Sequence, residues 1–186
     1  MTDRPLILFP IPDRANKEKG KGFPALGIKF PTPQRQFDRF EPDKDNATIA
    51  EGKFQNNAAF HIKAAAVGEE DGFLSFNASG GASGYVGSDG KDTVPSVALD
   101  SFINDKLTYI KMDIEGAELL ALRGGTKHIR EDAPKLAICA YHKPDDLRVL
   151  ISEIKSANPE YYFFLRHFSP KHKETVIFGI FPGNER

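Results

Sequence analysis

The chain has 186 residues, which allows one domain with a sizeable core and leaves too little for two. Hydrophobic residues make up 40% and charged residues 27%, proportions that are typical of a globular protein and argue against wholesale disorder. The formal net charge is -1, so no global basic field would draw the chain to nucleic acid or to a membrane. Neither is an expected partner.

The apolar runs are far shorter than a membrane span, and the N-terminus MTDRPLILFPIP is broken by proline, so a signal peptide is not expected. The only cysteine, Cys139, has no partner in the chain for a disulfide. These features predict a reducing, cytoplasmic setting.

Residues 1–36 differ from the rest of the chain. They hold six of the 13 prolines and show no sustained helical or strand period, so we expect an irregular arm in which only LILF could form a short strand. From residue 37 to residue 186 the pattern is that of an α/β domain.

Strand and helix patterns alternate along this second part. The expected strands cover residues 60–67, 72–77, a short stretch from residue 94, 107–113, 135–142, 161–168 and 174–181. The expected helices are a short one from Asp100 as N-cap, residues 117–125 with paired glycines at the end, and residues 145–158. Residues 77–92 form a loop rich in Gly, Ser and Asp. This order predicts a mostly parallel sheet with helices on its faces, closed by an antiparallel hairpin.

Ligands of such sheets bind at the carboxyl ends of the strands, and three candidate residues stand where a strand pattern ends: Glu41, Asp113 and His142. A carboxylate in FEPD, residues 40–43, can accept both hydroxyls of a ribose. A solvated turn is the simpler interpretation of that tetrapeptide on its own.

In KMDIEGAE, Asp113 ends a strand, while Glu115 and Glu118 lie in the turn and the first helical turn that follow. Acids near a helix start are stabilised by the helix dipole, so Glu115 and Glu118 have a structural explanation. Asp113 does not need to be acidic for that reason and is the better candidate for chemistry.

His142 in AYHKPDD could be a base, a substrate partner or a metal ligand, and His167 in LRHFS is a similar case. Asp113, Glu118 and these two histidines offer donor atoms for a divalent ion, but no spacing is typical of a metal site and we expect none. The remaining histidines, His61, His128 and His172, are interpreted as surface residues.

Several stretches together resemble one known family. FEPD, AAAVGEEDGFLSF, VPSVALDSFI, YIKMDIEGAELLALRGG, LAICAYHKPDDL and YYFFLRHFSPKHKETVIFGI follow in the order found in FkbM-type methyltransferases, over roughly residues 37–181. The resemblance implies a Rossmann-like, mostly parallel sheet of the S-adenosylmethionine-dependent methyltransferase type. It also implies transfer of a methyl group to a hydroxyl oxygen of a sugar or small metabolite, so the expected partner is a small-molecule or glycan acceptor.

By the same resemblance, Glu41 would bind the ribose of S-adenosylmethionine, and Ala65, Ala66 and Val67 would lie near its adenine. Asp113 would sit beside the methionine or the acceptor, and His142 would face the acceptor pocket. A hydroxyl acceptor benefits from a base, for which Asp113 and His142 are the catalytic candidates.

One expected part is missing. The family's first strand and glycine-rich loop, of the type D-x-G-A-x-x-G, should precede Glu41, but the nearest candidate is KGKGFPALG with Gly20, Gly22 and Gly27. Either LILFPIP, residues 6–12, replaces the central strand, or the sheet is N-terminally incomplete after truncation or an out-of-frame start. The proline-rich arm favours the second account. The alternative function is then a catalytically silent remnant of the fold that serves as a binding domain.

Overall fold

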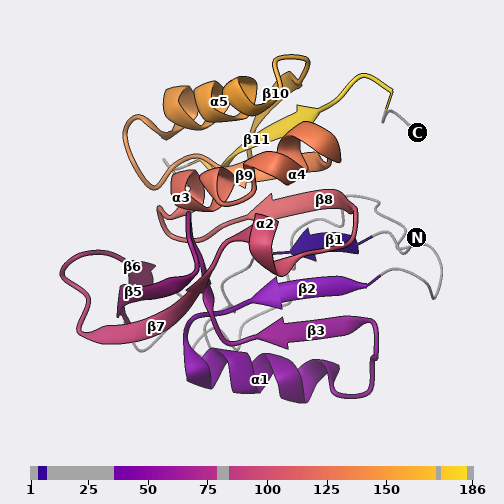
Figure 1. The fold of residues 1–186 in the computed structure, drawn as a ribbon. Coiled ribbons are helices and arrows are strands. Elements are labelled where there is room, and N and C mark those ends of the chain that lie inside the picture. The colour runs from indigo at the N-terminus through magenta and orange to yellow at the C-terminus, as the bar shows by residue number, and fades with distance from the viewer. Residues whose placement is uncertain (1–3, 8–35, 79–83, 171–172, 184–186) are drawn as a thin grey trace.

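The computed structural model describes residues 4–7, 36–78, 84–170 and 173–183, with only the backbone described for residues 4–7 (Figure 1). The elements are β1 (Arg4–Ile7), β2 (Phe37–Phe40), α1 (Lys44–Phe54), β3 (Phe60–Lys63), β4 (Ala66–Val67), β5 (Gly72–Asn77), β6 (Tyr85–Val86), β7 (Asp92–Val97), α2 (Leu99–Phe102), β8 (Leu107–Met112), α3 (Glu118–Arg123), α4 (Thr126–Glu131), β9 (Lys135–Cys139), α5 (Asp146–Ala157), β10 (Tyr162–His167) and β11 (Thr175–Ile180).

A mixed seven-stranded sheet in the order β10-β11-β9-β8-β1-β2-β3 forms the centre of the molecule. The strands from β9 to β3 pair in parallel, whereas β11 runs antiparallel to both β9 and β10. The expected antiparallel pairing of the last two strands is therefore confirmed. Parallel strands need a crossover between them, and the helices between β8, β9 and β10 supply it.

The central position of this sheet is occupied by β1. Leu6 is in register with Asp38 of β2 on one side and with Ile110 of β8 on the other. The expectation of an N-terminally incomplete sheet is therefore corrected: residues 4–7 pair with the backbone groups that β2 and β8 would otherwise leave unpaired. Residues 8–35, which include most of the predicted irregular arm and the candidate glycines, lie outside the described residues.

A second sheet, in the order β4-β7-β5-β6, was not expected from the sequence. The strand predicted over residues 60–67 divides into β3 and β4 because the Ala65 N–H bonds to the Lys63 carbonyl at 2.9 Å and closes a tight turn. The chain then leaves the first sheet for the second. The predicted loop over residues 77–92 contains β6, which pairs with β5, and residues 79–83 of it lie outside the described part. In Figure 1 the second sheet lies beyond the carboxyl ends of β8, β1 and β2.

Alternating side chains of the strands meet one face of α5 in the core. Leu136 and Ile138 of β9 and Leu150 and Ile154 of α5 are almost fully buried, and each such side chain contributes about 1.5–3 kcal/mol. The helix predicted over residues 145–158 is thus confirmed. Helix α1 has no comparable apolar stripe, which explains why periodicity did not reveal it. No helix in the described ranges is long and apolar enough to span a membrane.

Asp100 and His128 join α2 to α4 in a way that the sequence did not indicate. Asp100 lies inside α2, and its carboxylate accepts the N–H groups of Lys127 and His128 at 2.8 and 3.1 Å. It therefore caps α4 and not its own helix. His128 is only 7% exposed, so its interpretation as a surface residue is wrong.

Candidate active site

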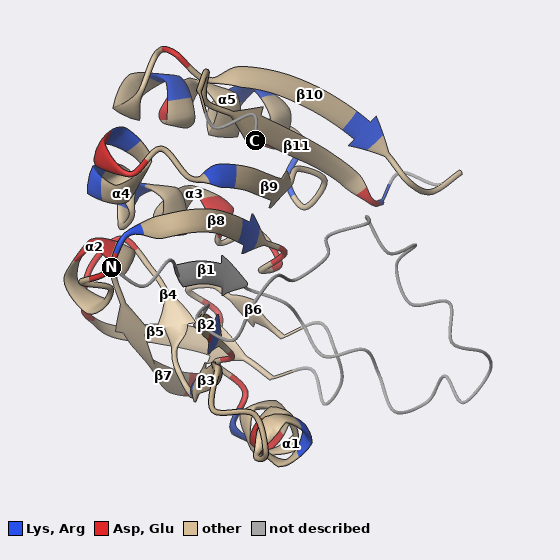
Figure 2. Ribbon diagram, turned by 90° about the vertical axis from the view of Figure 1, so that its right-hand side faces the viewer, with Lys and Arg blue, Asp and Glu red and all other residues tan. Residues whose placement is uncertain are grey.

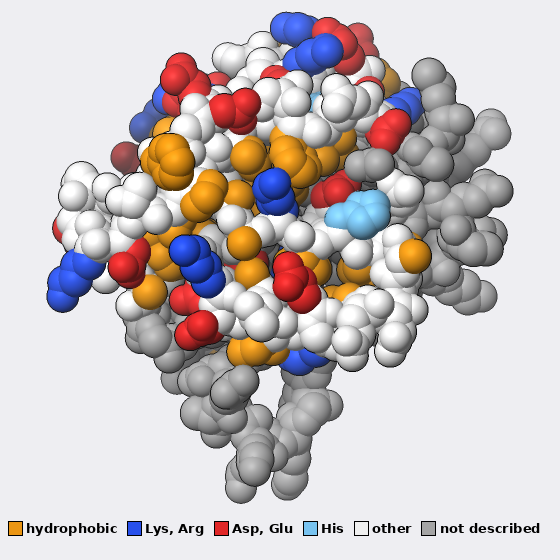
Figure 3. All heavy atoms as spheres, turned by 60° about the horizontal axis from the view of Figure 1, so that its bottom comes forward, with side chains coloured by type: hydrophobic (Ala, Val, Ile, Leu, Met, Phe, Trp, Pro, Cys, Tyr) orange, Lys and Arg blue, Asp and Glu red, His pale blue; other side chains and the backbone are white. Residues whose placement is uncertain are grey.

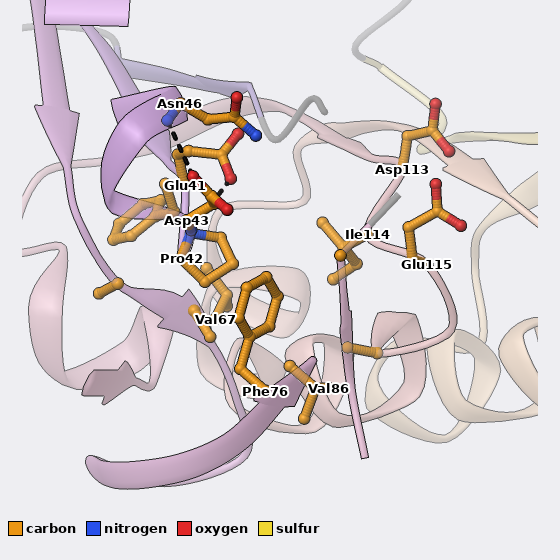
Figure 4. Close-up of a pocket in the computed structure, with 15 residues that line it drawn as sticks. Glu41, Pro42, Asp43, Asn46, Val67, Phe76, Val86, Asp113, Ile114 and Glu115 are labelled. Atoms are coloured by element: carbon orange, nitrogen blue, oxygen red, sulfur yellow. Dashed lines mark hydrogen bonds between the residues drawn. The ribbon is translucent and has the colours of Figure 1, made fainter. Parts of the chain in front are cut away.

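An open cleft lies at the carboxyl ends of β2 and β8, against the second sheet, and encloses about 560 Å³ including the part open to solvent. Figure 2 shows the acidic turn that follows β8 just beyond the end of that strand. Figure 4 shows Glu41 and Asp43 on one side of the cleft and Asp113 and Glu115 on the other.

Glu41 stands at the end of β2, where its backbone N–H still bonds to the carbonyl of Lys63 on β3 at 3.0 Å. Its side chain accepts the N–H of Asp43 at 3.2 Å and lies 3.8 Å from the guanidinium of Arg39. Burial raises the pKa of Glu41 to about 7, although the Asp43 N–H and the Arg39 charge oppose the rise. The carboxyl is therefore near half-ionised at neutral pH, and a ligand that donates hydrogen bonds to it would favour the charged form.

The apolar side of the cleft comes from residues around β4 and from the second sheet. Ala65, Ala66 and Val67 line it and are all buried, and Phe76 of β5 and Val86 of β6 extend the apolar surface (Figure 4). The alanine segment predicted to lie near an adenine thus shares one cleft with Glu41 and Asp113. Flat apolar surface of this kind suits an aromatic ring system.

Asp113 follows β8 and is held by one residue of β8 and one residue just beyond β9. The hydroxyl of Tyr141 donates to Asp113 Oδ1 at 2.9 Å, and Lys111 Nζ lies 3.8 Å from Oδ2. Burial, followed by the charge of Asp113, raises the pKa of the Tyr141 hydroxyl, which stays protonated and keeps donating. Burial lowers the pKa of Lys111 against the pull of Asp113. The Asp113 carboxylate is thereby oriented while it still borders the cleft.

The turn after Asp113 has strained backbone. Glu115 has a φ of 54° and Gly116 a φ of 93°, and the left-handed conformation costs a residue other than glycine about 1–2 kcal/mol. Lys143 Nζ donates to the Gly116 carbonyl and ties this turn to the loop after β9. Burial, with the charges of Asp113 and Glu118, raises the pKa of Glu115, while His142 opposes the rise. Glu115 also lines the cleft, a position that the sequence did not predict for it.

His142 does not line the cleft but lies behind its acidic wall. Its Nε2 is 3.6 Å from Asp113 Oδ1 and 3.6 Å from Glu115 Oε2, and its Nδ1 is 3.0 Å from Glu118 Oε1. Burial lowers the pKa of His142, but Glu118 and the other two carboxylates outweigh burial and the pKa is raised. The expectation that His142 faces an acceptor pocket therefore stays a prediction.

Glu118 is at the start of α3, as predicted, but it is not a surface charge. It is 1% exposed, and its Oε1 accepts the N–H of Ile114 at 2.9 Å. His167, the other candidate, is exposed on β10 with its Nδ1 2.8 Å from Thr175 Oγ1, so the structure does not bring it to this cluster.

Two residues besides Glu115 were missed in the sequence. Asp43 caps α1 by accepting the Asn46 N–H at 2.9 Å, and Tyr141 holds Asp113. Asp43 carried a usable signal, since an acid directly before the first residue of a helix is a typical N-cap. Tyr141 carried none, because its contact joins residues that are 28 positions apart.

Comparison with known proteins adds to this geometry. A family model described as "Methyltransferase FkbM domain" matches residues 29–168. The chain is similar to the crystal structure of methyltransferase FkbM from Methylobacillus flagellatus KT, with 29% identity, a TM-score of 0.66, and coverage of 78% of this chain but only 37% of that one. It also shares its fold with a protein from Clostridium thermocellum described as an rRNA-methylase, at 8% identity and a TM-score of 0.53, covering 98% of this chain and 92% of that one. No curated protein matches the chain.

Proposed function

Because the chain belongs to the FkbM methyltransferase family, we propose that it transfers a methyl group from S-adenosylmethionine to a hydroxyl oxygen of a sugar or small metabolite. The observation that carries the proposal is that Glu41 and Asp113 lie on opposite sides of one cleft, with the apolar Ala65–Val67 segment also lining it. In this proposal the first sheet, with β1 at its centre, is the Rossmann-like sheet of the methyltransferase type.

The residues of the cleft suit this cofactor. The ionised Glu41 can accept two ribose hydroxyls, and Val67, Phe76 and Ile114 offer apolar surface to an adenine. S-adenosylmethionine would supply an activated methyl group on sulfur. The chain's own task is to hold the acceptor oxygen in line with that methyl group and to exclude water, which is where most of the rate gain of such a displacement originates.

Asp113 is the proposed base. It borders the cleft, and Tyr141 fixes one of its oxygens, so the other can accept the proton that the hydroxyl loses as the oxygen–carbon bond forms. His142, whose raised pKa favours the protonated form, would act behind Asp113 as a positive charge and not as the base that contacts the acceptor.

The acceptor is proposed to be a small molecule or glycan and not a nucleic acid. Basic and acidic side chains are interspersed on the face shown in Figure 3, without the single-sign patch that phosphate backbones require. The buried free thiol of Cys139 is compatible with the reducing, cytoplasmic setting that we propose.

Isothermal titration with S-adenosylmethionine tests the proposal. We expect micromolar binding by the wild-type chain and weaker binding by Glu41→Gln. Asp45→Asn, which alters an exposed acid in the first turn of the nearby helix α1, is the control and should bind as the wild type does. No heat at millimolar ligand would favour a catalytically silent fold. Transfer of a labelled methyl group to hydroxylated sugars and metabolites, lost in Asp113→Asn, then tests the reaction itself.

A further inference from the structure

The two buried histidines of the described residues differ sharply in how their ring nitrogens are satisfied. His128 Nδ1 lies 2.6 Å from Asp132 Oδ2, and its Nε2 lies 3.1 Å from the Ile103 carbonyl. The His142 side chain is 8% exposed. Its Nδ1 forms an ion pair with Glu118 Oε1 at 3.0 Å, and its Nε2 comes no closer than 3.6 Å to a carboxylate of the described residues. Buried polar groups without well-aligned hydrogen bonds are rare, so the ring of His142 has room for a further ligand.

Glu118 presents a second such group at the same place. Its Oε1 accepts the Ile114 N–H, while its Oε2 is buried without a hydrogen-bond partner in the described part of the chain. His142 Nδ1 is 3.0 Å from the Glu118 carboxylate. The imidazole nitrogen of His142 and the carboxylate of Glu118 are thus both buried and adjacent, and both are donor groups of the kind that divalent cations bind.

Asp146, the first residue of α5, completes the group. One ligand atom from each of Glu118, His142 and Asp146 lies within 4.8 Å of the other two. Metal–ligand bonds of about 2.0–2.6 Å place two ligands about 3–5 Å apart, so one cation fits among the three. We propose that Glu118, His142 and Asp146 bind one divalent transition-metal cation of the class of Mn²⁺ and Zn²⁺.

The surroundings of His142 agree with such a site. With Nδ1 on the cation, the hydrogen on Nε2 points toward Asp113 and Glu115, each 3.6 Å away. A carboxylate on the far nitrogen is the usual second contact of a metal-bound histidine, and it fixes the tautomer of the ring. The cation would replace the proton on Nδ1 and take over from the protonated ring as the positive charge behind the two carboxylates that border the cleft.

Asp146 is itself held in place. Its Oδ2 accepts the N–H of Lys143 at 2.7 Å, so the carboxylate does not need a cation in order to take this orientation. None of the three ligands lines the cleft, and the proposal does not depend on methyl transfer. Failure of one proposal therefore leaves the other standing.

The test is calorimetric titration of MnCl₂ and ZnCl₂ into the tag-free, chelator-treated full chain in the absence of cofactor. We expect one Mn²⁺ per chain with a dissociation constant below 100 μM. Glu118→Gln and Asp146→Asn keep the size of each side chain and should weaken binding at least tenfold. Asp132→Asn, which alters the other buried histidine–carboxylate pair, should stay within twofold of wild type.

Absence of binding by both ions up to 1 mM would overturn the proposal, and so would wild-type affinity in the two ligand variants. If those variants fail to fold by circular dichroism, the wild-type protein alone decides the question. Pulsed electron paramagnetic resonance of bound Mn²⁺ should show coupling to one imidazole nitrogen. A bound ion without that coupling would exclude His142 as a ligand.

Discussion

Glu41 gives the cleft a predictable dependence on pH. Its pKa is about 7 in the free protein, since burial of the carboxyl outweighs the Asp43 N–H and the Arg39 charge. Only the ionised form can accept both hydroxyls of a ribose. With this pKa, about one tenth of the carboxyl is ionised at pH 6 and about nine tenths at pH 8. The dissociation constant of a ribose-bearing ligand should therefore fall about tenfold between pH 6 and pH 8.

The assay is calorimetric titration with 5′-methylthioadenosine at pH 6, 7 and 8, because this ligand keeps the ribose and adenine but lacks the titrating amino group of the cofactor. Glu41→Gln should bind about 10–100-fold more weakly at pH 8 and show no pH dependence, since a hydrogen bond to a charged group contributes about 1.5–3 kcal/mol. Asp45→Asn should follow the wild-type curve. The reasoning is refuted if the wild-type constant is equal at pH 6 and pH 8, or if Glu41→Gln keeps the same slope.

The raised pKa of Glu41 also affects the free energy of unfolding: ligand binding should strengthen as the pH rises, whereas the stability of the free protein should fall. The folded-state pKa of Glu41 is raised above the value of about 4.5 that an unfolded carboxyl has. Its contribution to stability is therefore complete below pH 4.5 and is lost as the pH rises through 7. In urea unfolding without ligand, the difference between wild type and Glu41→Gln should follow this window.

Three further substitutions test other parts of the site and fold. Asp113→Asn should lower the transfer rate at least about 100-fold with little change in the melting temperature, and Tyr141→Phe, which frees that carboxylate, should have a smaller effect of the same kind; equal rates in wild type and Asp113→Asn would contradict the assignment. Glu118→Ala should lower the free energy of unfolding in urea by about 3 kcal/mol, because it removes the acceptor of the buried Ile114 N–H and the ion-pair partner of His142. A loss below about 0.5 kcal/mol would show that these two contacts do not stabilise the fold. Asp100→Ala should cost about 1–2 kcal/mol through loss of the α4 cap, and Asp100→Asn less, so equal stability of Asp100→Ala and wild type would show that α4 does not need this carboxylate.

Local patterns in the sequence predicted the parts of the fold that depend on near neighbours. The 3.6-residue period placed α5, and β-branched and aromatic runs placed β8, β9, β10 and β11. Strand ends then predicted Glu41 and Asp113 as residues of one site, because parallel strands bring their carboxyl ends to the same edge of a sheet. The structure places both residues on one cleft.

Tertiary structure decided the rest, for reasons that spacing along the chain cannot express. The sequence offered residues 6–12 as one of two accounts of the central strand, and so short a stretch could not decide between them. Arg4 to Ile7 form that strand because β2 and β8 offer backbone groups on both sides. Burial depends on what packs against a side chain. Glu118 and His128 are therefore buried, although residues of these polar types are usually found at the surface. The sequence by itself thus determined where strands end and which acids follow them. Only the packing of α3 and α5 against the sheet decided that Glu118, His142 and Asp146 meet behind Asp113.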